Sequence, residues 1–122
     1  MKSHKVLIVE DNELNMELIT DVLSLAGFEI VTAGDGKQAL EIAASARPDI
    51  VLMDVQLPGM DGLEATRQLK ANPETASIPV VAITSHAMKN EREDALEAGC
   101  AGYFPKPIDV STLAANVKKF LL

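Results

Sequence analysis

Apolar side chains cluster in five short runs along the chain, and a segment with helical periodicity follows each run. The runs lie at residues 5–9, 28–32, 50–53, 78–83 and 102–104. In the third run four apolar residues, Ile50 to Met53, follow one another without polar alternation. Such a run is typical of a strand buried on both faces, as in a parallel sheet beneath helices. The pattern therefore predicts five strands that alternate with five helices.

The segments after these runs carry apolar residues at spacings of three and four, which places them on one face of a helix. In the first helix this face comprises Leu18, Ile19, Val22, Leu23 and Ala26. In the second it comprises Ala39, Leu40, Ala43 and Ala46, and a third helix is expected over residues 63–71. The fourth helix, over residues 88–98, offers only Met88, Ala95, Leu96 and Ala98. The last helix, from about Asp109, presents Val110, Leu113, Ala114, Val117, Phe120 and Leu121.

Capping and turn residues mark the ends of these elements. Asp11 or Asn12 can cap the first helix with a side-chain oxygen, and Gly27 and Gly99 are the expected stops of the first and fourth helices. Strict alternation with right-handed crossovers predicts a doubly wound α/β fold with a five-stranded parallel sheet. We choose the flavodoxin-like strand order 2-1-3-4-5, in a single domain over residues 1–122.

Composition and charge narrow the possible functions. With 48% hydrophobic residues the chain can bury a core, but no apolar run approaches the ~18–20 residues of a membrane span. The first apolar run, VLIV after MKSHK, is too short for a signal peptide, and acidic residues follow it at once. We therefore expect a cytoplasmic protein. A net charge of −7 argues against nucleic-acid binding, which needs clusters of basic residues. The single cysteine, Cys100, excludes an internal disulfide and a cysteine-based zinc site.

Acidic residues gather at the ends of two strands that this order makes neighbours. Glu10 and Asp11 follow the first strand and Asp54 ends the third, at the switch point where ligands collect in such sheets. Two unit charges 4 Å apart repel by about 4 kcal/mol at an effective dielectric near 20. Three carboxylates together therefore favour a bound hard cation, and Mg²⁺ suits an all-oxygen site of this kind. The alternative is that Glu10 and Asp11 serve only the start of the following helix.

Two further strand ends add polar groups to the same edge. Thr84 ends the fourth strand with a hydroxyl, and Lys106, after the fifth, supplies a cation that could pair with Asp54. Each feature is common on its own, since many strands end in a hydroxyl and many loops carry a lysine. Together with the carboxylates they predict a phosphoryl-transfer site. Asp54 would be the nucleophile, and Mg²⁺, Lys106 and Thr84 would stabilise the charge of the transferring group.

Four segments around these residues have a specific sequence and spacing: VLIVEDN, LMDVQLPGMDG, VVAITS and YFPKPI. In them the chain closely resembles the receiver domain of two-component response regulators, of the stand-alone CheY-like and DivK-like kind, over essentially its whole length. The resemblance implies that Asp54 accepts a phosphoryl group from a histidine kinase or a phosphotransfer protein. It also implies that Mg²⁺ is held by Asp11, Asp54 and the backbone carbonyl of Gln56. Glu10 would act on the ion largely through water.

The same resemblance assigns roles to residues beyond the acidic cluster. Thr84 and Lys106 would bind the phosphoryl oxygens. Tyr103 would be the aromatic residue that swings inward when Thr84 moves toward the phosphate, although from the sequence alone it could equally be a half-buried strand residue. The Lys106–Pro107 bond is similar to the cis peptide of the family, and an X-Pro bond is the one place where the cis form costs little.

The output surface is expected around the fourth helix. Residues 88–98 offer little apolar area, and at about 25 cal/mol per Å² this helix should be the most weakly held. We expect phosphorylation to change this helix, the strand around Tyr103 and the last helix, which would then bind a downstream protein target. By the same resemblance, Gln56 and His86 would flank the path of the hydrolytic water, and both are long enough to obstruct or orient it.

Several alternatives compete with a stand-alone phosphorylated switch. The run EDNELN also resembles receivers attached to hybrid histidine kinases. A phosphohydrolase that forms an aspartyl phosphate usually has a second Asp two residues after the nucleophile, where this chain has Gln56. A flavin or nucleotide carrier would need a Gly-rich or hydroxyl-rich cradle in place of EDNELN, and the complete set of acidic residues and lysine argues against an inert docking receiver. We expect a switch, not an enzyme, that catalyses only its own phosphorylation and dephosphorylation.

Overall fold

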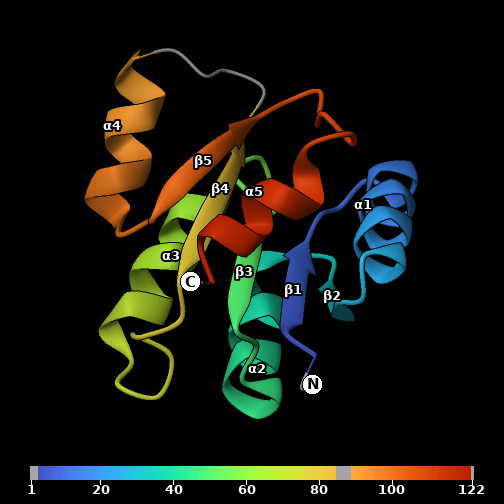
Figure 1. The fold of residues 1–122 in the computed structure, drawn as a ribbon. Coiled ribbons are helices and arrows are strands. Elements are labelled where there is room, and N and C mark those ends of the chain that lie inside the picture. Colours follow the sequence, from blue (N-terminus) through green and yellow to red (C-terminus); the bar gives the residue numbers. More distant parts are fainter. Residues whose placement is uncertain (1–2, 85–88, 122) are drawn as a thin grey trace.

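The structure, a computed structural model, describes residues 3–84 and 89–121. Five strands and five helices alternate along this part of the chain (Figure 1). The strands are β1 (Lys5–Val9), β2 (Glu29–Ala33), β3 (Ile50–Asp54), β4 (Val80–Thr84) and β5 (Gly102–Pro105). The helices are α1 (Glu13–Leu25), α2 (Gly36–Ala46), α3 (Gly62–Ala71), α4 (Lys89–Ala98) and α5 (Leu113–Lys119). Apart from the start of α5, these bounds lie close to those predicted from the sequence.

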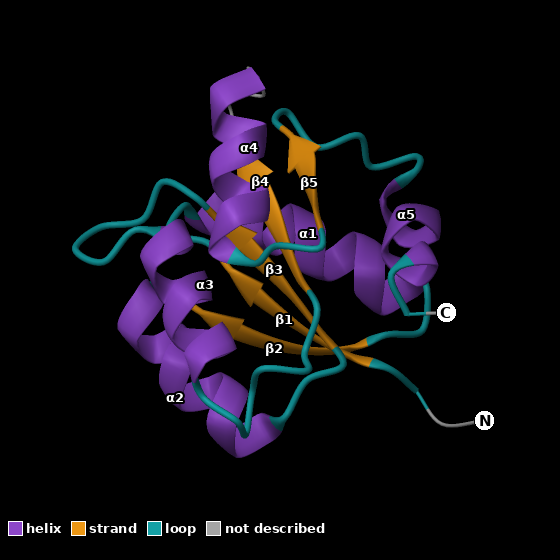
Figure 2. Ribbon diagram, turned by 90° about the vertical axis from the view of Figure 1, so that its left-hand side faces the viewer, coloured by secondary structure: helices purple, strands orange, loops and turns teal. Residues whose placement is uncertain are grey.

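The five strands form one parallel sheet in the order β2-β1-β3-β4-β5. Helices cover both of its faces (Figure 2). Helices α1 and α5 pack on one face, and α2, α3 and α4 pack on the other. The prediction of a doubly wound, flavodoxin-like fold is therefore confirmed.

Strand β1 shows why the apolar runs lack polar alternation. Successive side chains of a strand point to opposite faces of the sheet. Val6 and Ile8 belong to the core beneath α1 and α5, whereas Leu7 and Val9 belong to the core beneath α2, α3 and α4. All four side chains are fully buried because helices cover both faces.

Side-chain caps begin three of the helices. Asn12, and not Asp11, caps α1: its side-chain oxygen accepts a hydrogen bond from the backbone N–H of Asn15 at 3.0 Å. Asp35 and Asp61 cap α2 and α3 in the same way. The choice between Asp11 and Asn12 that the sequence left open is thereby settled, and Asp11 precedes the helix cap.

Two leucines that the periodicity placed in the core are exposed. In α1, Ile19 and Leu23 lie one turn apart and face the sheet, which turns Leu18 sideways toward the solvent. In α4, Ala95 is buried, and the next residue, Leu96, is turned away from the sheet with 56% of its surface exposed. The predictions for Leu18 and Leu96 were wrong because a helical spacing identifies a stripe but not its exact rotation toward the sheet.

Helix α5 begins four residues later than predicted. The Asp109 carboxylate accepts hydrogen bonds from the backbone N–H and the hydroxyl of Ser111, at 3.0 and 2.6 Å. This local bonding favours a turn over residues 109–112, and the helix starts only at Leu113. Val110 lies in that turn and is exposed, so the prediction that it packs in the core was also wrong.

Some predictions concern residues 85–88, which lie outside the described residues. These are the core position of Met88 and the effect of His86 on the hydrolytic water. Among the helices of residues 3–84 and 89–121, none has the length and hydropathy to cross a membrane.

Candidate functional site

Three carboxylates meet at the carboxyl end of the sheet, between β1 and β3. Val9 and Met53 are paired across these strands, so Glu10, which follows β1, and Asp54, which ends β3, are neighbours. Carboxylate oxygens of Glu10, Asp11 and Asp54 all lie within 4.8 Å of one another. Glu10 and Asp54 are buried, whereas Asp11 is exposed. The cluster thus has two acidic groups in the protein interior and one at the solvent.

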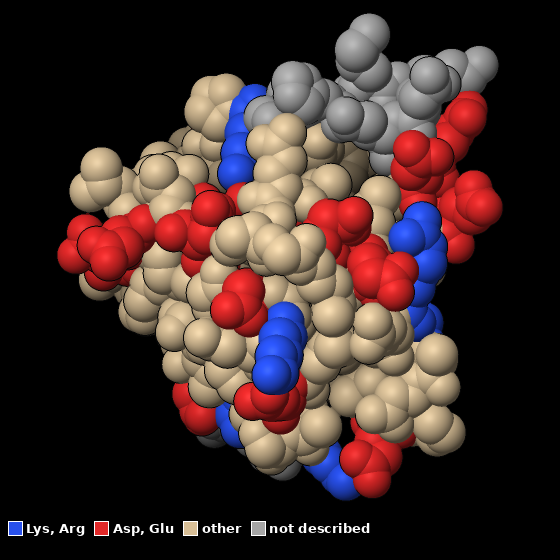
Figure 3. Space-filling view, turned by 180° about the vertical axis from the view of Figure 1, so that it is seen from behind, with Lys and Arg blue, Asp and Glu red and all other residues tan. Residues whose placement is uncertain are grey.

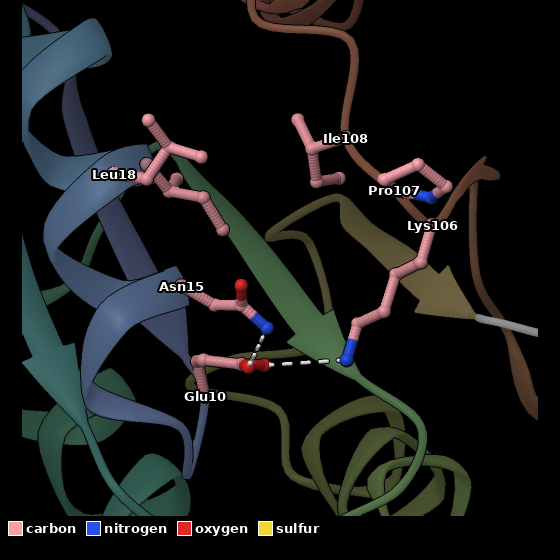
Figure 4. A pocket seen from close by; sticks show the side chains of 7 residues that line it. Glu10, Asn15, Leu18, Lys106, Pro107 and Ile108 are labelled. Atoms are coloured by element: carbon pink, nitrogen blue, oxygen red, sulfur yellow. Dashed lines mark hydrogen bonds and ion pairs between the residues drawn. The ribbon is translucent and has the colours of Figure 1, made fainter.

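Lys106 adds a positive charge to this acidic cluster. Its Nζ lies 2.8 Å from Oδ2 of Asp54. The same ammonium lies 3.7 Å from Oε2 of Glu10 (Figure 4). Burial alone would lower the pKa of Lys106, but the hydrogen bond and charge of Asp54, together with the charges of Glu10 and Asp11, outweigh it and raise the pKa. Lys106 is therefore held as a cation against Asp54.

The two oxygens of Glu10 have different surroundings. Oε1 accepts a hydrogen bond from Nδ2 of Asn15 at 3.0 Å (Figure 4). Oε2 is buried and has no hydrogen-bond partner among the described residues. Burial is the main cause that raises the pKa of Glu10 from 4.5 to about 7. The Asp54 carboxyl raises it further, whereas Asn15 and Lys106 oppose the rise.

The main chain that follows Asp54 holds this residue in place. The backbone N–H of Gln56 donates a hydrogen bond to Oδ1 of Asp54 at 2.9 Å. Farther along the loop, the N–H of Gly62 donates to the carbonyl of Val55 at 3.0 Å. Gly62 lies so close to β3 that a Cβ there would collide with the backbone carbonyl of Asp54. Glycine at position 62 is therefore required by space rather than by backbone conformation.

The neighbouring strand ends carry the remaining predicted residues. Thr84 is buried at the end of β4, and its carbonyl accepts a hydrogen bond from the backbone N–H of Lys106 at 2.8 Å. The Lys106–Pro107 peptide bond is cis. Tyr103 is half-buried in β5, and its hydroxyl accepts a hydrogen bond from Nη1 of Arg92 in α4 at 3.0 Å. Tyr103 therefore contacts α4 in this structure.

The structure brings four of the predicted residues into one cluster: Glu10, Asp11, Asp54 and Lys106. Gln56 contributes its backbone N–H, and its side chain is exposed. Sequence reasoning missed Asn15, although an asparagine inside a helix is unfavourable and so hints at a specific partner. It also missed Gly62 and Arg92. Arg92 carries no such hint, because its partner lies on a different element.

A groove of about 350 Å³ opens beside the cluster, between α1 and the segment after β5 (Figure 4). Its lining residues are Glu10, Asn15, Leu18, Ile19, Lys106, Pro107 and Ile108. Glu10 and Lys106 belong to the cluster, and Leu18 is the leucine that the periodicity wrongly assigned to the core. Leu18 therefore lines this groove and does not belong to the core.

The donor set of the cluster fits a hard divalent cation such as Mg²⁺. All of its negatively charged ligand atoms are carboxylate oxygens, which Mg²⁺ prefers. The buried Oε2 of Glu10, which lacks a hydrogen-bond donor among the described residues, would gain a partner in the cation or in one of its waters. The cluster can thus bind a cation and present the Asp54 carboxylate to an incoming electrophile.

Comparisons with known proteins agree with this arrangement. The sequence profile of the response regulator receiver domain matches residues 6–118. The polar-differentiation response regulator DivK of Brucella anthropi is 45% identical over 116 residues, which is 95% of this chain and 94% of that protein.

Two solved structures show the same fold. The chemotaxis response regulator CheY4 of Vibrio cholerae has a TM-score of 0.93 and 28% identity, and the match covers 98% of this chain and all of that one (100%). The second is the receiver domain of the sensor histidine kinase PA1611 of Pseudomonas aeruginosa, which contains a magnesium ion coordinated in its active site cleft. It has a TM-score of 0.90 and 33% identity, with 98% of each chain covered.

Proposed function

Because the chain belongs to the response regulator receiver domain family, we propose that it is a phospho-acceptor switch in a two-component phosphorelay. Asp54 would take the phosphoryl group from a phosphohistidine of a histidine kinase or phosphotransfer protein. The observation that supports this most directly is the Asp54–Lys106 pair, 2.8 Å apart within a cluster of carboxylates. Such a pair combines a nucleophile with a cation that can follow the transferred charge.

In the proposed transfer, a carboxylate oxygen of Asp54 attacks phosphorus in line with the leaving group. The P–N bond to the donor imidazole breaks, and its electron pair stays on the nitrogen. Lys106, which now bonds Oδ2 of Asp54, would shift to a phosphoryl oxygen. The Thr84 hydroxyl, from the adjacent strand end, would donate to another phosphoryl oxygen. The product is an aspartyl phosphate that water later hydrolyses.

A magnesium ion is the proposed cofactor. Glu10, Asp11, Asp54 and the backbone carbonyl of Gln56 would hold it, with Glu10 acting largely through water. When bound, the ion supplies positive charge that offsets the charge of the phosphoryl oxygens. The magnesium ion in the receiver of PA1611 supports this assignment by similarity.

Phosphorylation would then alter the face formed by α4, β5 and α5. As Thr84 moves toward the phosphate, Tyr103 would turn inward and leave Arg92. The face would bind a downstream protein. Acidic side chains, with basic ones interspersed, are spread over the side of the molecule opposite to that in Figure 1 (Figure 3). The net charge of −7 suits a protein partner with basic or apolar patches and not a nucleic acid.

The proposed setting is the cytoplasm, where kinases that use ATP supply phosphohistidine. The chemistry would be the same in a receiver attached to a hybrid histidine kinase, and the likeness to the PA1611 receiver supports that alternative. In either setting the chain acts on its own carboxylate, so we propose a signalling switch and not an enzyme with a separate substrate.

Incubation with acetyl phosphate and Mg²⁺, followed by intact mass measurement, tests the proposal. We expect one phosphoryl adduct on the unaltered protein, none in EDTA, and none on Asp54→Asn. Glu41→Gln, a matched acid-to-amide change on the exposed surface of α2, should be phosphorylated normally. An adduct that persists in Asp54→Asn, or its absence from the unaltered protein, would contradict the proposal.

A further inference from the structure

Asn15 makes a specific contact with the acidic cluster that none of the functions above uses. It lies in the first turn of α1, and its Nδ2 donates a hydrogen bond to Oε1 of Glu10 at 3.0 Å (Figure 4). Glu10 is 3% exposed, so water contributes little to the solvation of its carboxylate. In the described part of the chain, this amide and the more distant ammonium of Lys106 are the donors beside that carboxylate.

We infer that Asn15 is a positioning residue for the cation site, acting through Glu10. The terminal torsion of a glutamate is broad and poorly restrained on its own. A hydrogen bond to Oε1 restrains it and keeps Oε2 on the side of Lys106, whose Nζ is 3.7 Å away. Oε2, buried and without a hydrogen-bond partner among the described residues, is then the oxygen that faces the cation or its water. The inference rests on the proposed function, because it assumes that the cluster binds a cation.

The helix itself does not need this side chain. The first turn is already capped by Asn12, whose side-chain oxygen accepts from the backbone N–H of Asn15 at 3.0 Å. Asparagine is less favourable than leucine or alanine inside a helix. The stability of α1 therefore gives no reason for an asparagine at position 15, whereas the contact with Glu10 does.

An amide is also the donor that best suits this position. At position 15, lysine or arginine would add a positive charge that competes with the cation for the carboxylates. Aspartate would add a fourth carboxylate to the cluster. A neutral amide orients Glu10 and leaves the negative charge of the cluster unchanged. Partners of this kind behind metal ligands typically contribute about 10–100-fold to metal affinity or activity.

A double-mutant cycle on the whole chain tests the inference with Mn²⁺, a paramagnetic substitute for Mg²⁺. Free Mn²⁺ is measured by electron paramagnetic resonance for the unaltered protein, Asn15→Leu, Glu10→Ala and the double variant. We expect Asn15→Leu to weaken Mn²⁺ binding about tenfold. In the Glu10→Ala background, where no carboxylate remains to be positioned, the same change should have no further effect.

Asn116→Leu is the matched control. The Asn116 amide donates a hydrogen bond to the Thr112 hydroxyl at 3.4 Å, and neither residue belongs to the acidic cluster. The Mn²⁺ affinity of this variant should therefore be unchanged. Circular dichroism in EDTA reports whether each variant is folded, and Asn15→Ala replaces Asn15→Leu if leucine prevents folding.

Two results would overturn the role of Asn15 while leaving the proposed function intact. One is an unchanged affinity in both Asn15 variants. The other is a loss of the same size with and without Glu10, which would show that Asn15 does not act through that carboxylate. If the unaltered protein itself fails to bind Mn²⁺ or Mg²⁺, the proposed function fails together with the inference.

Discussion

The guanidinium of Arg92 lies over the ring of Tyr103, with 5.7 Å between its central carbon and the ring centroid. Its Nη1 also donates a hydrogen bond to the tyrosine hydroxyl at 3.0 Å. Arg92 belongs to α4 and Tyr103 to β5, so this double contact links the two elements. It favours the position of Tyr103 found here over one in which the ring turns toward Thr84.

Replacement of Arg92 by leucine should loosen α4. An exposed cation–π contact and a hydrogen bond together contribute about 1 kcal/mol or slightly more. Amide hydrogen exchange over residues 92–104 should therefore become about fivefold faster. Because Tyr103 would leave Arg92 in the proposed switch, phosphorylation by acetyl phosphate should also become faster.

Arg67→Leu, which removes an exposed ion pair with Glu64 in α3, is the control and should change neither rate. Equal exchange in the Arg92 and Arg67 variants would show that the contact with Tyr103 does not hold α4.

Without a bound cation, the stability of the protein should fall as the pH rises. The pKa of Glu10 is about 7 in the folded state, against 4.5 as its ordinary value, so between these values the folded state binds a proton that the unfolded state has lost. The contribution of Glu10 to the free energy of unfolding is fully present below about pH 4.5 and is lost as the pH rises through about 7. The loss is on the order of 3 kcal/mol, at about 1.4 kcal/mol per pKa unit.

Urea unfolding in EDTA between pH 5 and pH 8 measures this slope. Glu10→Gln should flatten it, whereas Glu41→Gln on the surface should not. A Glu10→Gln variant with the slope of the unaltered protein would assign the pH dependence to other groups.

Lys106→Met should destabilise the protein in EDTA and increase its response to Mg²⁺. The change leaves Asp54 and Glu10 without the ammonium that lies 2.8 and 3.7 Å from them. Loss of one partner from a buried ion pair costs several kcal/mol, and we expect about 2 kcal/mol here because Lys106 is partly exposed. Mg²⁺ should raise the melting temperature of this variant by more than it raises that of the unaltered protein.

Thermal melts with and without Mg²⁺ provide the comparison, and Lys118→Met, at an exposed position of α5, is the control. A smaller Mg²⁺ effect in Lys106→Met than in the unaltered protein would argue against a cation site in the cluster.

Gly62→Ala should be strongly destabilising because its Cβ would collide with the backbone of Asp54. Overpacking of this kind typically costs about 1–3 kcal/mol. Gly34→Ala is the matched control, since its Cβ would make an ordinary contact, 3.7 Å from the side chain of Gln38. Chemical unfolding of both variants measures the difference, and similar unfolding free energies would show that the loop after β3 adapts easily.

The fold could be predicted because its strands are buried on both faces, which leaves continuous apolar runs such as Ile50 to Met53. The acidic cluster could be predicted because parallel strands end at the same edge, so that residues 10, 11 and 54 meet once the strand order is known. The start of α5 could not be predicted, because it depends on one hydrogen-bonded turn at Asp109.

Contacts between side chains of different elements could not be predicted from the sequence either. Arg92 and Tyr103 lie on a helix and a strand, and only the packing of α4 against β5 brings them together. Asn15 and Glu10 are close in sequence, but the direction of the amide toward Oε1 depends on how α1 leaves the end of β1. Such contacts are set by how the elements pack in three dimensions.

Within residues 92–98 of α4, the side chains that reach the core are those of Ala95 and Ala98. A methyl group fills so little space that it leaves no substantial void when it moves, unlike a leucine, whose removal costs several kcal/mol. A shift of this stretch across the sheet by about 1–2 Å would therefore cost little packing energy. Small anchoring side chains therefore suit the part that we propose for α4, which is to carry a displacement from Asp54 to a distant surface.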